Sequence, residues 1–268
     1  MDEMRRRLML LAATFPAGVA AASRADDDLT HHVQHMEQVP TDAPKIGFLV
    51  YPRMVMLDLA GPMTIFRILR CNVHLVWKDR QPCATDLFPV TPTHTFSECP
   101  LDLDVLMIPG GILGTVNCMN DPQVLAFVSS RGNRARWVTS VCTGGLVLAA
   151  AGLLKGYNAT AHWAVADLLP LMGARHVDER VVTDRNRMTG GGVTAGIDLG
   201  LTLASALAGE EAARNVALNI EYSPHPPFQN GTPSEAGPER TLKIRQARQG
   251  MDREARIAAE AAGKRLGL

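Results

Sequence analysis

The stretch of sequence that decides the fold is R-W-V-T-S-V-C-T-G-G-L-V-L-A-A-A-G-L-L, from Arg136 to Leu154. Its first part, Trp137 to Thr139, is aromatic and β-branched, which favours a β-strand. Its last part, Leu146 to Leu154, is apolar on all sides and predicts a buried helix. Few residues separate the two, so the chain must turn sharply, and the small residues Ser140 and Gly144 make room for that turn. The stretch therefore predicts a tight strand–turn–helix unit with a cysteine at its apex.

Cys142 is that apex residue, and the geometry suggests a role for it. A side chain at this position projects over the end of the sheet, as the serine of a nucleophile elbow does. The free N–H groups and the dipole at the start of the helix stabilise a thiolate. We therefore expect Cys142 to be a nucleophile. The alternative is a buried structural cysteine on a strand-to-helix turn.

By composition the chain divides into three parts, residues 1–44, 45–228 and 229–268. In the first part, Arg5 to Arg7 precede a short apolar run, Leu8 to Ala22, which is typical of an export signal and too short to cross a bilayer. Its arginines and weak hydrophobicity favour a twin-arginine signal peptide and a periplasmic location. The alternative is a cytoplasmic protein whose extension is not a signal. The second part is the predicted folded domain, and the third is a charged, helical C-terminal extension.

Within the predicted domain, apolar strands alternate with helical patterns, which predicts an α/β fold with an open, mostly parallel sheet and helices on both faces. The predicted strands are Lys45–Tyr51, Asn72–Lys78, Leu103–Ile108, the strand before Cys142, Val181–Thr183 and Arg187–Thr189. The predicted helices are Leu59–Leu69, Asp121 to about Ser130, Leu146–Leu154, Ala164–Met172, Val193–Leu207 and Glu210–Ile220. In such sheets the ligand site lies beyond the carboxyl ends of the strands. The turns at Tyr51-Pro52, Pro109–Gly111 and Cys142 should therefore converge on one site.

Composition excludes several classes of function. The chain has 27 basic and 27 acidic residues, so its net charge gives no case for nucleic-acid binding. Its five cysteines form no C-x-x-C pair, which excludes a zinc ribbon and a dithiol redox motif. Gly190 to Gly192 lack the Lys and Ser/Thr of a phosphate-binding loop. We expect a small-molecule substrate, with no metal, nucleic-acid or membrane partner.

Several stretches carry a resemblance to a known family. They are K-I-G-F-L-V-Y-P, L-D-L-A-G-P, I-P-G-G, S-V-C-T-G-G-L-V-L, A-H-W-A, E-R-V-V-T-D-R-N, T-G-G-G-V-T-A-G-I-D and E-Y-S-P-H-P-P-F, and they extend from Lys45 to about Phe228. The sequence resembles the ThiJ/PfpI superfamily, which has a flavodoxin-like, class I glutamine-amidotransferase-like fold, and within it most closely the isonitrile hydratases. The resemblance implies a homodimeric, cofactor-free hydro-lyase that converts an isonitrile into an N-substituted formamide.

The resemblance also assigns roles to residues. It makes Cys142 the nucleophile, places Asp58 beside it and makes Thr143 the threonine that hydratases use after the nucleophile. Gly110 and Gly111 fall on the backbone N–H groups that face the thiolate. For Asp58 there is a structural alternative, the N-cap of the helix that follows it. For Thr143 the alternative is an early helix residue that satisfies its own backbone.

Two further polar residues have open roles. Some members of the superfamily pair a histidine with the cysteine, so His162 is a candidate pocket residue. A plain residue at the start of a helix is the alternative. Asp198, on an apolar helix, is expected to contact a partner subunit or cap a backbone group and not to act in catalysis.

The chemistry follows from a thiolate and a carboxyl group held together. A Cys142 thiolate would attack the terminal carbon of the isonitrile while Asp58 delivers a proton, and the thioimidate would then be hydrolysed. Burial beside a thiolate should raise the pKa of Asp58, so that the carboxyl is protonated near neutrality. One alternative is another cofactor-free cysteine enzyme, glyoxalase-like, deglycase-like or amidase-like. Another is a non-enzymatic redox-sensing protein in which Cys142 is oxidised.

Overall fold

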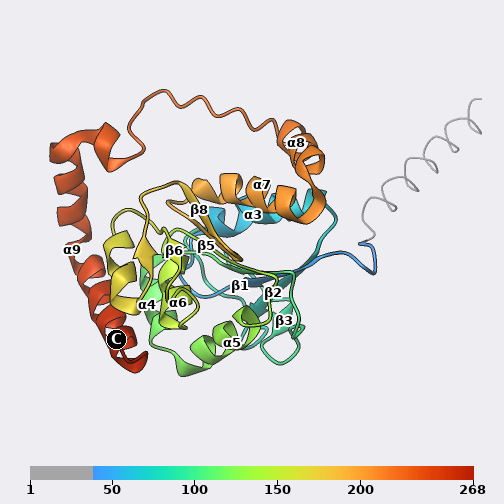
Figure 1. Cartoon of the computed structure of the whole chain (residues 1–268), viewed down its shortest axis with the longest axis horizontal. Helices are drawn as coiled ribbons and strands as arrows, with labels where there is room; N and C mark the ends of the chain where they lie inside the picture. The colour runs from blue at the N-terminus through green and yellow to red at the C-terminus, as the bar shows by residue number, and fades with distance from the viewer. Residues whose placement is uncertain (1–38) are drawn as a thin grey trace, which may run out of the picture. The chain divides into compact units, whose positions relative to one another are not determined.

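A central parallel sheet organises the chain in the computed structural model, which describes residues 39–268. Within that range the sheet has seven strands in the order β3-β2-β1-β4-β5-β9-β8 (Figure 1). All neighbouring pairs are parallel except β8 and β9, which are antiparallel. The strands are β1 Lys45–Leu49, β2 Asn72–Trp77, β3 His94–Thr95, β4 Val105–Ile108, β5 Trp137–Val141, β8 Val181–Asp184 and β9 Arg187–Gly190. The predicted open, mostly parallel α/β sheet is therefore confirmed.

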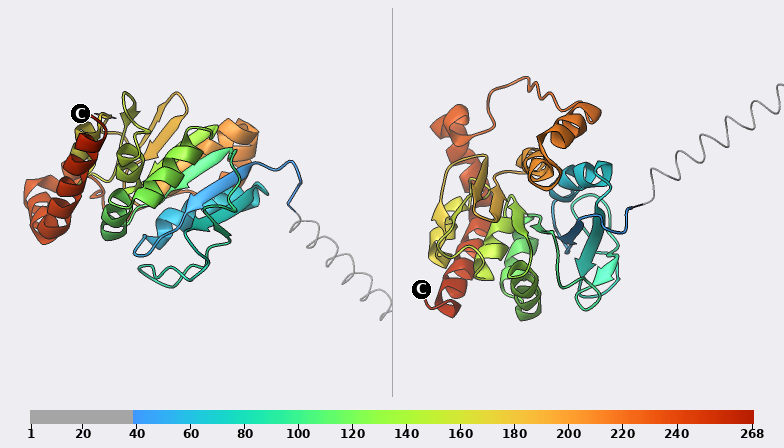
Figure 2. Two further views of the ribbon diagram at one scale, coloured as in Figure 1. Left: turned by 90° about the horizontal axis from the view of Figure 1, so that it is seen from below. Right: turned by 45° about the vertical axis from the view of Figure 1, so that its right-hand side comes forward.

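Two layers of helices cover the sheet (Figure 1, Figure 2). One layer holds α3 (Met56–Ile68), α7 (Ala195–Ala208) and α8 (Glu210–Asn219). The other holds α4 (Ile112–Met119), α5 (Pro122–Gly132) and α6 (Gly144–Ala150). Because both faces are covered, the central strand β4 is apolar throughout, and every one of its residues is buried.

The structure differs from the sequence-based expectations in several elements, among them three helices. Helix α4 was not predicted, because Gly114 to Asn117 are weak helix formers. Helix α6 ends at Ala150 and not at Leu154, and Gly152 soon after it has a φ of 79°. The helix predicted over Ala164–Met172 is a 3₁₀ helix, η1 (Ala166–Met172), in which Pro170 lacks an N–H for the helical ladder.

The C-terminal extension is the helix α9 (Pro233–Arg265), which opens with a capping box between Thr232 and Glu235. The chain kinks at Gly237, where φ is 77°. Beyond the kink, α9 packs against α4, α6 and η1. It does so through small side chains that are buried in the main core, namely Ala255, Ala258, Ala259 and Ala262.

Smaller elements complete the described part. The Pro- and Thr-rich stretch 82–97 contributes β3 at the edge of the sheet. Strands β6 (Asn158–Ala159) and β7 (Arg175–His176) form a separate parallel pair. In residues 39–268 no helix is both long and apolar enough to cross a membrane. The predicted export signal, with the location inferred from it, lies outside the described residues.

Candidate active site

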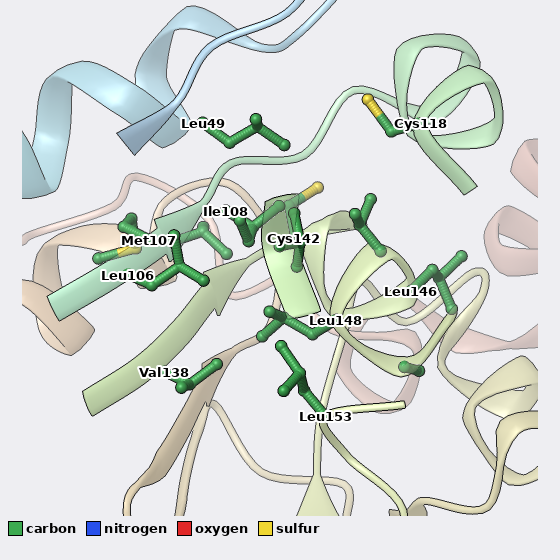
Figure 3. Packing of buried hydrophobic residues seen from close by; sticks show 14 of the residues in the cluster. Leu49, Leu106, Met107, Ile108, Cys118, Val138, Cys142, Leu146, Leu148 and Leu153 are labelled. Carbon is green, nitrogen blue, oxygen red and sulfur yellow. The ribbon is translucent and has the colours of Figure 1, made fainter. Parts of the chain in front are cut away.

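The turn between β5 and α6 holds Cys142 in an unusual backbone conformation. Its φ is 58°, in the left-handed region that side chains other than glycine rarely adopt. Two residues on, a Cβ atom at Gly144 would collide with the carbonyl oxygen of Ile108. The small residue that the sequence analysis required is therefore needed for the tight turn. Figure 3 shows Cys142 among apolar side chains of the core, including Ile108 and Leu148.

The backbone of Cys142 is held on two sides. Its N–H donates to the carbonyl oxygens of Gly190 at 3.1 Å, the last residue of β9, and of Gly191 at 2.7 Å, just beyond that strand. Its own carbonyl oxygen accepts a hydrogen bond from the His162 N–H at 3.1 Å. The side chain is only 4% exposed. The turn is thus fixed by the end of β9 and by the loop that follows β6.

Asp58 lies in the first turn of α3 and is fully buried, with 0% exposure. Its Oδ2 accepts a hydrogen bond of 2.8 Å from the Gly110 N–H, whereas its Oδ1 has no hydrogen-bond partner. The N-cap of α3 is Val55, whose side chain makes no capping hydrogen bond, and the Met56 N–H at the start of the helix donates to Asp86 Oδ1 at 2.9 Å. The alternative that Asp58 caps its helix is therefore wrong, because the carboxyl group is bonded to the turn after β4.

The ends of three strands meet at Gly110. A Cβ atom at this glycine would lie 2.7 Å from Asp58 Oδ2, 2.8 Å from Cys142 Cβ and 2.7 Å from the Thr143 backbone nitrogen. The Gly110 carbonyl oxygen also accepts the Val55 N–H at 2.9 Å. The predicted convergence of these turns at the carboxyl end of the sheet is confirmed, and the absence of a side chain at Gly110 permits it.

Asp58 and Cys142 influence each other's ionisation. Burial raises the pKa of Asp58 from 3.8 to about 7, against the smaller effects of the Gly110 hydrogen bond and of a contact with the Cys142 thiol. Burial, with the Asp58 carboxylate second, raises the pKa of the Cys142 thiol well above its usual range. The thiolate expected at the helix N-terminus is therefore not favoured in the resting protein, since burial outweighs the Thr143 backbone N–H. Near neutrality the thiol keeps its proton while Asp58 titrates, and the charge of each group affects the pKa of the other.

Thr143 and the two glycines are engaged with each other. The Thr143 hydroxyl oxygen accepts the Gly111 N–H at 2.9 Å and lies 2.7 Å from the Thr115 hydroxyl oxygen. Since the Gly110 N–H is bonded to Asp58, neither glycine N–H is free to face a thiolate or a substrate oxygen. This corrects the expectation for Gly110 and Gly111, whose N–H groups position Asp58 and Thr143.

Sequence reasoning missed the residues behind Thr143. The Thr115 hydroxyl lies 3.2 Å from the Tyr51 hydroxyl, which donates to the Pro109 carbonyl oxygen at 2.7 Å. Both side chains are fully buried. A Tyr at the end of an apolar strand was a visible signal, because a buried phenol needs a hydrogen-bond partner. Thr115 carried no signal, because its helix was not predicted.

His162 lies in the loop before η1 and not at the start of a helix. Its Nδ1 accepts the Ala164 N–H at 3.2 Å. Burial, with a smaller effect of Arg248, lowers the pKa of His162 to about 4, so the imidazole is neutral near neutral pH. Its backbone N–H is bonded to the Cys142 carbonyl oxygen, whereas its ring is bonded to the Ala164 N–H and not to the thiol. His162 is therefore placed as a neutral residue beside the site.

A cavity of about 490 Å³ adjoins this site. His162 and Gly191 line it, together with Trp163 and, from the start of the C-terminal extension, Thr232 and Ser234. Cys142 is not among the lining residues, so the cavity reaches the residues next to the thiol and not the thiol itself.

Asp198 lies apart from the site. It forms an ion pair with Arg180 at 2.6 Å and accepts a hydrogen bond from the Tyr222 hydroxyl at 3.1 Å. This pairing accounts for its place on an apolar helix. Across residues 39–268, no group of three or more His, Cys, Asp or Glu side chains is placed to hold a metal ion.

Comparison with known proteins agrees with this geometry. Residues 44–206 match the model of the DJ-1/PfpI family. The chain belongs to the DJ-1/PfpI family. It is 52% identical over 196 residues to the isonitrile hydratase of Pseudomonas putida. The aligned residues are 72% of this chain and 85% of that protein.

Two further proteins are similar to this DJ-1/PfpI protein, one in structure and one in sequence. A crystal structure of a ThiJ/PfpI family protein from Pseudomonas syringae superposes with a TM-score of 0.79 at 41% identity, covering 84% of this chain and 94% of the other. The HTH-type transcriptional regulator GbdR of Pseudomonas aeruginosa is 29% identical over 190 residues, which are 66% of this chain and 50% of the regulator. The ThiJ/PfpI resemblance and the flavodoxin-like fold that it implies are thus confirmed.

Proposed function

We propose that the protein is an isonitrile hydratase-like enzyme, a hydro-lyase that adds water to an isonitrile to give an N-substituted formamide. The observation that carries the proposal is the buried pair of Cys142 and Asp58, in which one carboxyl oxygen has no hydrogen-bond partner. The 52% identity to the isonitrile hydratase of Pseudomonas putida supports this function over others of the family.

The first half of the reaction joins sulfur to carbon. Asp58 takes the thiol proton as Cys142 Sγ attacks the terminal carbon of R–N≡C, so that an S–C bond forms. Asp58 then gives that proton to the same carbon, which yields the thioimidate Cys–S–CH=N–R. A carboxyl with a pKa of about 7 suits both steps, because it gains and loses a proton with nearly equal ease near neutrality.

The second half releases the product. Water adds its oxygen to the thioimidate carbon while one of its protons passes to nitrogen. As the C=O bond forms, the C–S bond breaks, and the remaining hydroxyl proton returns through Asp58 to the departing sulfur. The sum is R–N≡C plus water giving R–NH–CHO, with thiol and carboxyl restored. In this scheme Thr143 is a positioning residue. Its hydroxyl group is hydrogen-bonded to the Gly111 N–H and to the Thr115 hydroxyl, and these bonds fix the turn beside Asp58.

Direct measurement of product tests the proposal. The purified chain is incubated with cyclohexyl and aryl isonitriles, and the formamide is quantified by liquid chromatography and mass spectrometry. We expect formamide from the parent protein and none above background from Cys142→Ala. Cys118→Ala is the matched control, because Cys118 is equally buried but lies on α4. Formamide production by Cys142→Ala would refute the mechanism.

The same assay addresses the other functions considered for the sequence. Methylglyoxal is tested beside the isonitriles, and its turnover without any formamide would favour a glyoxalase-like enzyme. A redox sensor is disfavoured by the 4% exposure of Cys142 and by the raised pKa of its thiol, since oxidation needs an accessible thiolate.

A further inference from the structure

Helix α9 presents arginines to the segment that lies next to the site. Arg245 donates a long hydrogen bond of 3.5 Å from Nη1 to the Ala164 carbonyl oxygen, and its guanidinium carbon lies 5.0 Å from the centre of the Trp163 ring. Arg248 follows one turn later, so both arginines share one face of the helix. The same segment contains His162, whose backbone N–H donates a hydrogen bond to the Cys142 carbonyl oxygen.

Arg248 is mostly withdrawn from solvent and only partly satisfied. Its side chain is 20% exposed, and its Nη2 donates to Asp252 Oδ1 at 3.1 Å. Its Nε is buried and has no hydrogen-bond partner. A guanidinium has five N–H donors, so one carboxylate leaves most of its donor capacity free. An unpaired buried N–H is costly, and an anionic ligand that accepted from it would remove that cost.

The Arg248 charge is felt at the reaction centre. It acts electrostatically on Cys142 and on His162, lowering the pKa of each. The charged residues that line the nearby cavity are Asp178, Glu179 and Arg180, all exposed, and Arg180 is paired with Asp198. Arg248 is not a lining residue of this cavity and lies on the helix beside it. Arg248 therefore acts on both groups, and its guanidinium is only partly paired.

We propose that Arg248, carried by the C-terminal helix α9, anchors an anionic group of the substrate. The substrate class is then isonitriles that carry a carboxylate, which a guanidinium binds through two parallel hydrogen bonds. This inference rests on the proposed hydratase function. Arg248 contacts the substrate away from the reacting carbon, so its contribution is to substrate affinity and orientation.

The test compares 4-isocyanobenzoate with its methyl ester, which has the same ring and no charge. We expect the parent enzyme to have the higher kcat/KM with the carboxylate. Arg248→Met should lower kcat/KM for the carboxylate by about 10- to 100-fold, mainly through KM, as expected for loss of a charge-assisted hydrogen bond. The value for the ester should change by less than about threefold, a difference too small for a lost charged contact. Arg248→Lys should recover part of the loss.

Arg256→Met is the matched control. Arg256 lies on the same helix and forms an exposed ion pair with Asp167, so its loss should leave both substrates unaffected. Equal kcat/KM for the two substrates in the parent enzyme would overturn the inference. An equal loss of kcat/KM for both substrates in Arg248→Met would also overturn it, because Arg248 would then act on the reactivity of the thiol or on the stability of the fold.

Product binding separates this inference from the proposed function. The affinity of 4-formamidobenzoate and of its methyl ester is measured by calorimetry on the parent protein, on Arg248→Met and on Arg248→Lys, each first checked for folding by circular dichroism. If no isonitrile is hydrated, the hydratase proposal fails, whereas carboxylate-selective binding that Arg248→Met abolishes still supports the anion site. Binding without selectivity for the carboxylate, or no binding of either compound, contradicts the anion site.

Discussion

The Gly110 backbone N–H donates a hydrogen bond of 2.8 Å to Asp58 Oδ2, and Asp58 Oδ1 receives none. One neutral donor offsets only part of the cost of burying a carboxylate, so the pKa of Asp58 stays raised to about 7. The same bond orients the carboxyl group, with its free oxygen available for proton transfer. The backbone contact thus sets the direction of the group on which the proposed chemistry depends, and burial sets its raised pKa.

Replacement of Gly110 by alanine should displace that carboxyl group. The added Cβ would lie 2.7 Å from Asp58 Oδ2 and 2.8 Å from Cys142 Cβ, so both side chains must move. A displacement of about 1 Å can cost about 100-fold in rate, and we expect Gly110→Ala to lose at least that much in kcat/KM. Gly250→Ala, where a Cβ would meet no atom within 4 Å, is the control and should keep full activity. A fully active Gly110→Ala enzyme would show that the close approach is not needed.

The pH dependence of activity should report the raised pKa of Asp58. Below its pKa the carboxyl is protonated and cannot take the thiol proton, so kcat/KM should fall as the pH decreases through about 7. Above that value the carboxylate is available, and the Cys142 thiol, with its raised pKa, keeps its proton until the attack. The profile is measured on the parent enzyme and on Asp58→Asn, in which this limb should disappear. A limb that persists in Asp58→Asn would have to come from another group.

Thr143→Val should test the hydroxyl network behind the site. Valine keeps the shape of threonine but leaves the Gly111 N–H and the Thr115 hydroxyl without their partner. We expect a loss of unfolding free energy of about 1–3 kcal/mol, the cost of an unsatisfied buried polar group, together with lower kcat. Urea denaturation and steady-state kinetics measure the two effects. Thr143→Ser keeps the hydroxyl and should retain most of both, and a Ser variant as impaired as Val would point to the methyl group instead.

Much of the fold could be predicted because several strands are mainly apolar or β-branched. A central parallel strand such as β4, buried on both faces, shows this pattern directly. The turn at Cys142 was predictable because so tight a turn requires a small residue two positions after its apex, and the sequence has Gly144 there. Helix α4 was not, since Gly114 and Thr115 disfavour a helix locally and only packing against α6 and α9 compensates.

The sequence analysis named residues that the structure brings together, but it did not predict how they interact. Gly110 and Gly111 were expected to face the thiolate, and their N–H groups are bonded to Asp58 and Thr143 instead. The partner of a backbone N–H is decided by three-dimensional packing, which a sequence motif does not contain. Burial caused the other discrepancy, because the environment of Cys142 favours the thiol over the thiolate.

Substitution of Asp58 should separate its chemical role from its structural role. Asp58→Asn keeps the shape and removes the proton donor and acceptor, so we expect a loss of about 10²–10⁴-fold in rate. Asp58→Glu keeps the carboxyl group but moves it by one methylene, and it should also lose activity through misplacement. Steady-state kinetics on both variants provide the measurement. Activity close to that of the parent in Asp58→Asn would refute the catalytic role.

The same substitution should stabilise the protein, and more so as the pH rises. The pKa of Asp58 is raised from 3.8 to about 7 by folding, so the folded state is penalised wherever the unfolded carboxyl would ionise. The penalty is absent below about pH 4, grows through about three pH units and is complete above about pH 7, with a ceiling of about 4 kcal/mol at about 1.4 kcal/mol per unit. Urea denaturation of the parent and of Asp58→Asn at about pH 5 and about pH 8 should therefore show the larger gain at the higher pH. A gain that does not change with pH would mean that the carboxyl is not penalised by burial, whereas a rising gain beside the lost activity would show stability sacrificed for catalysis at this residue.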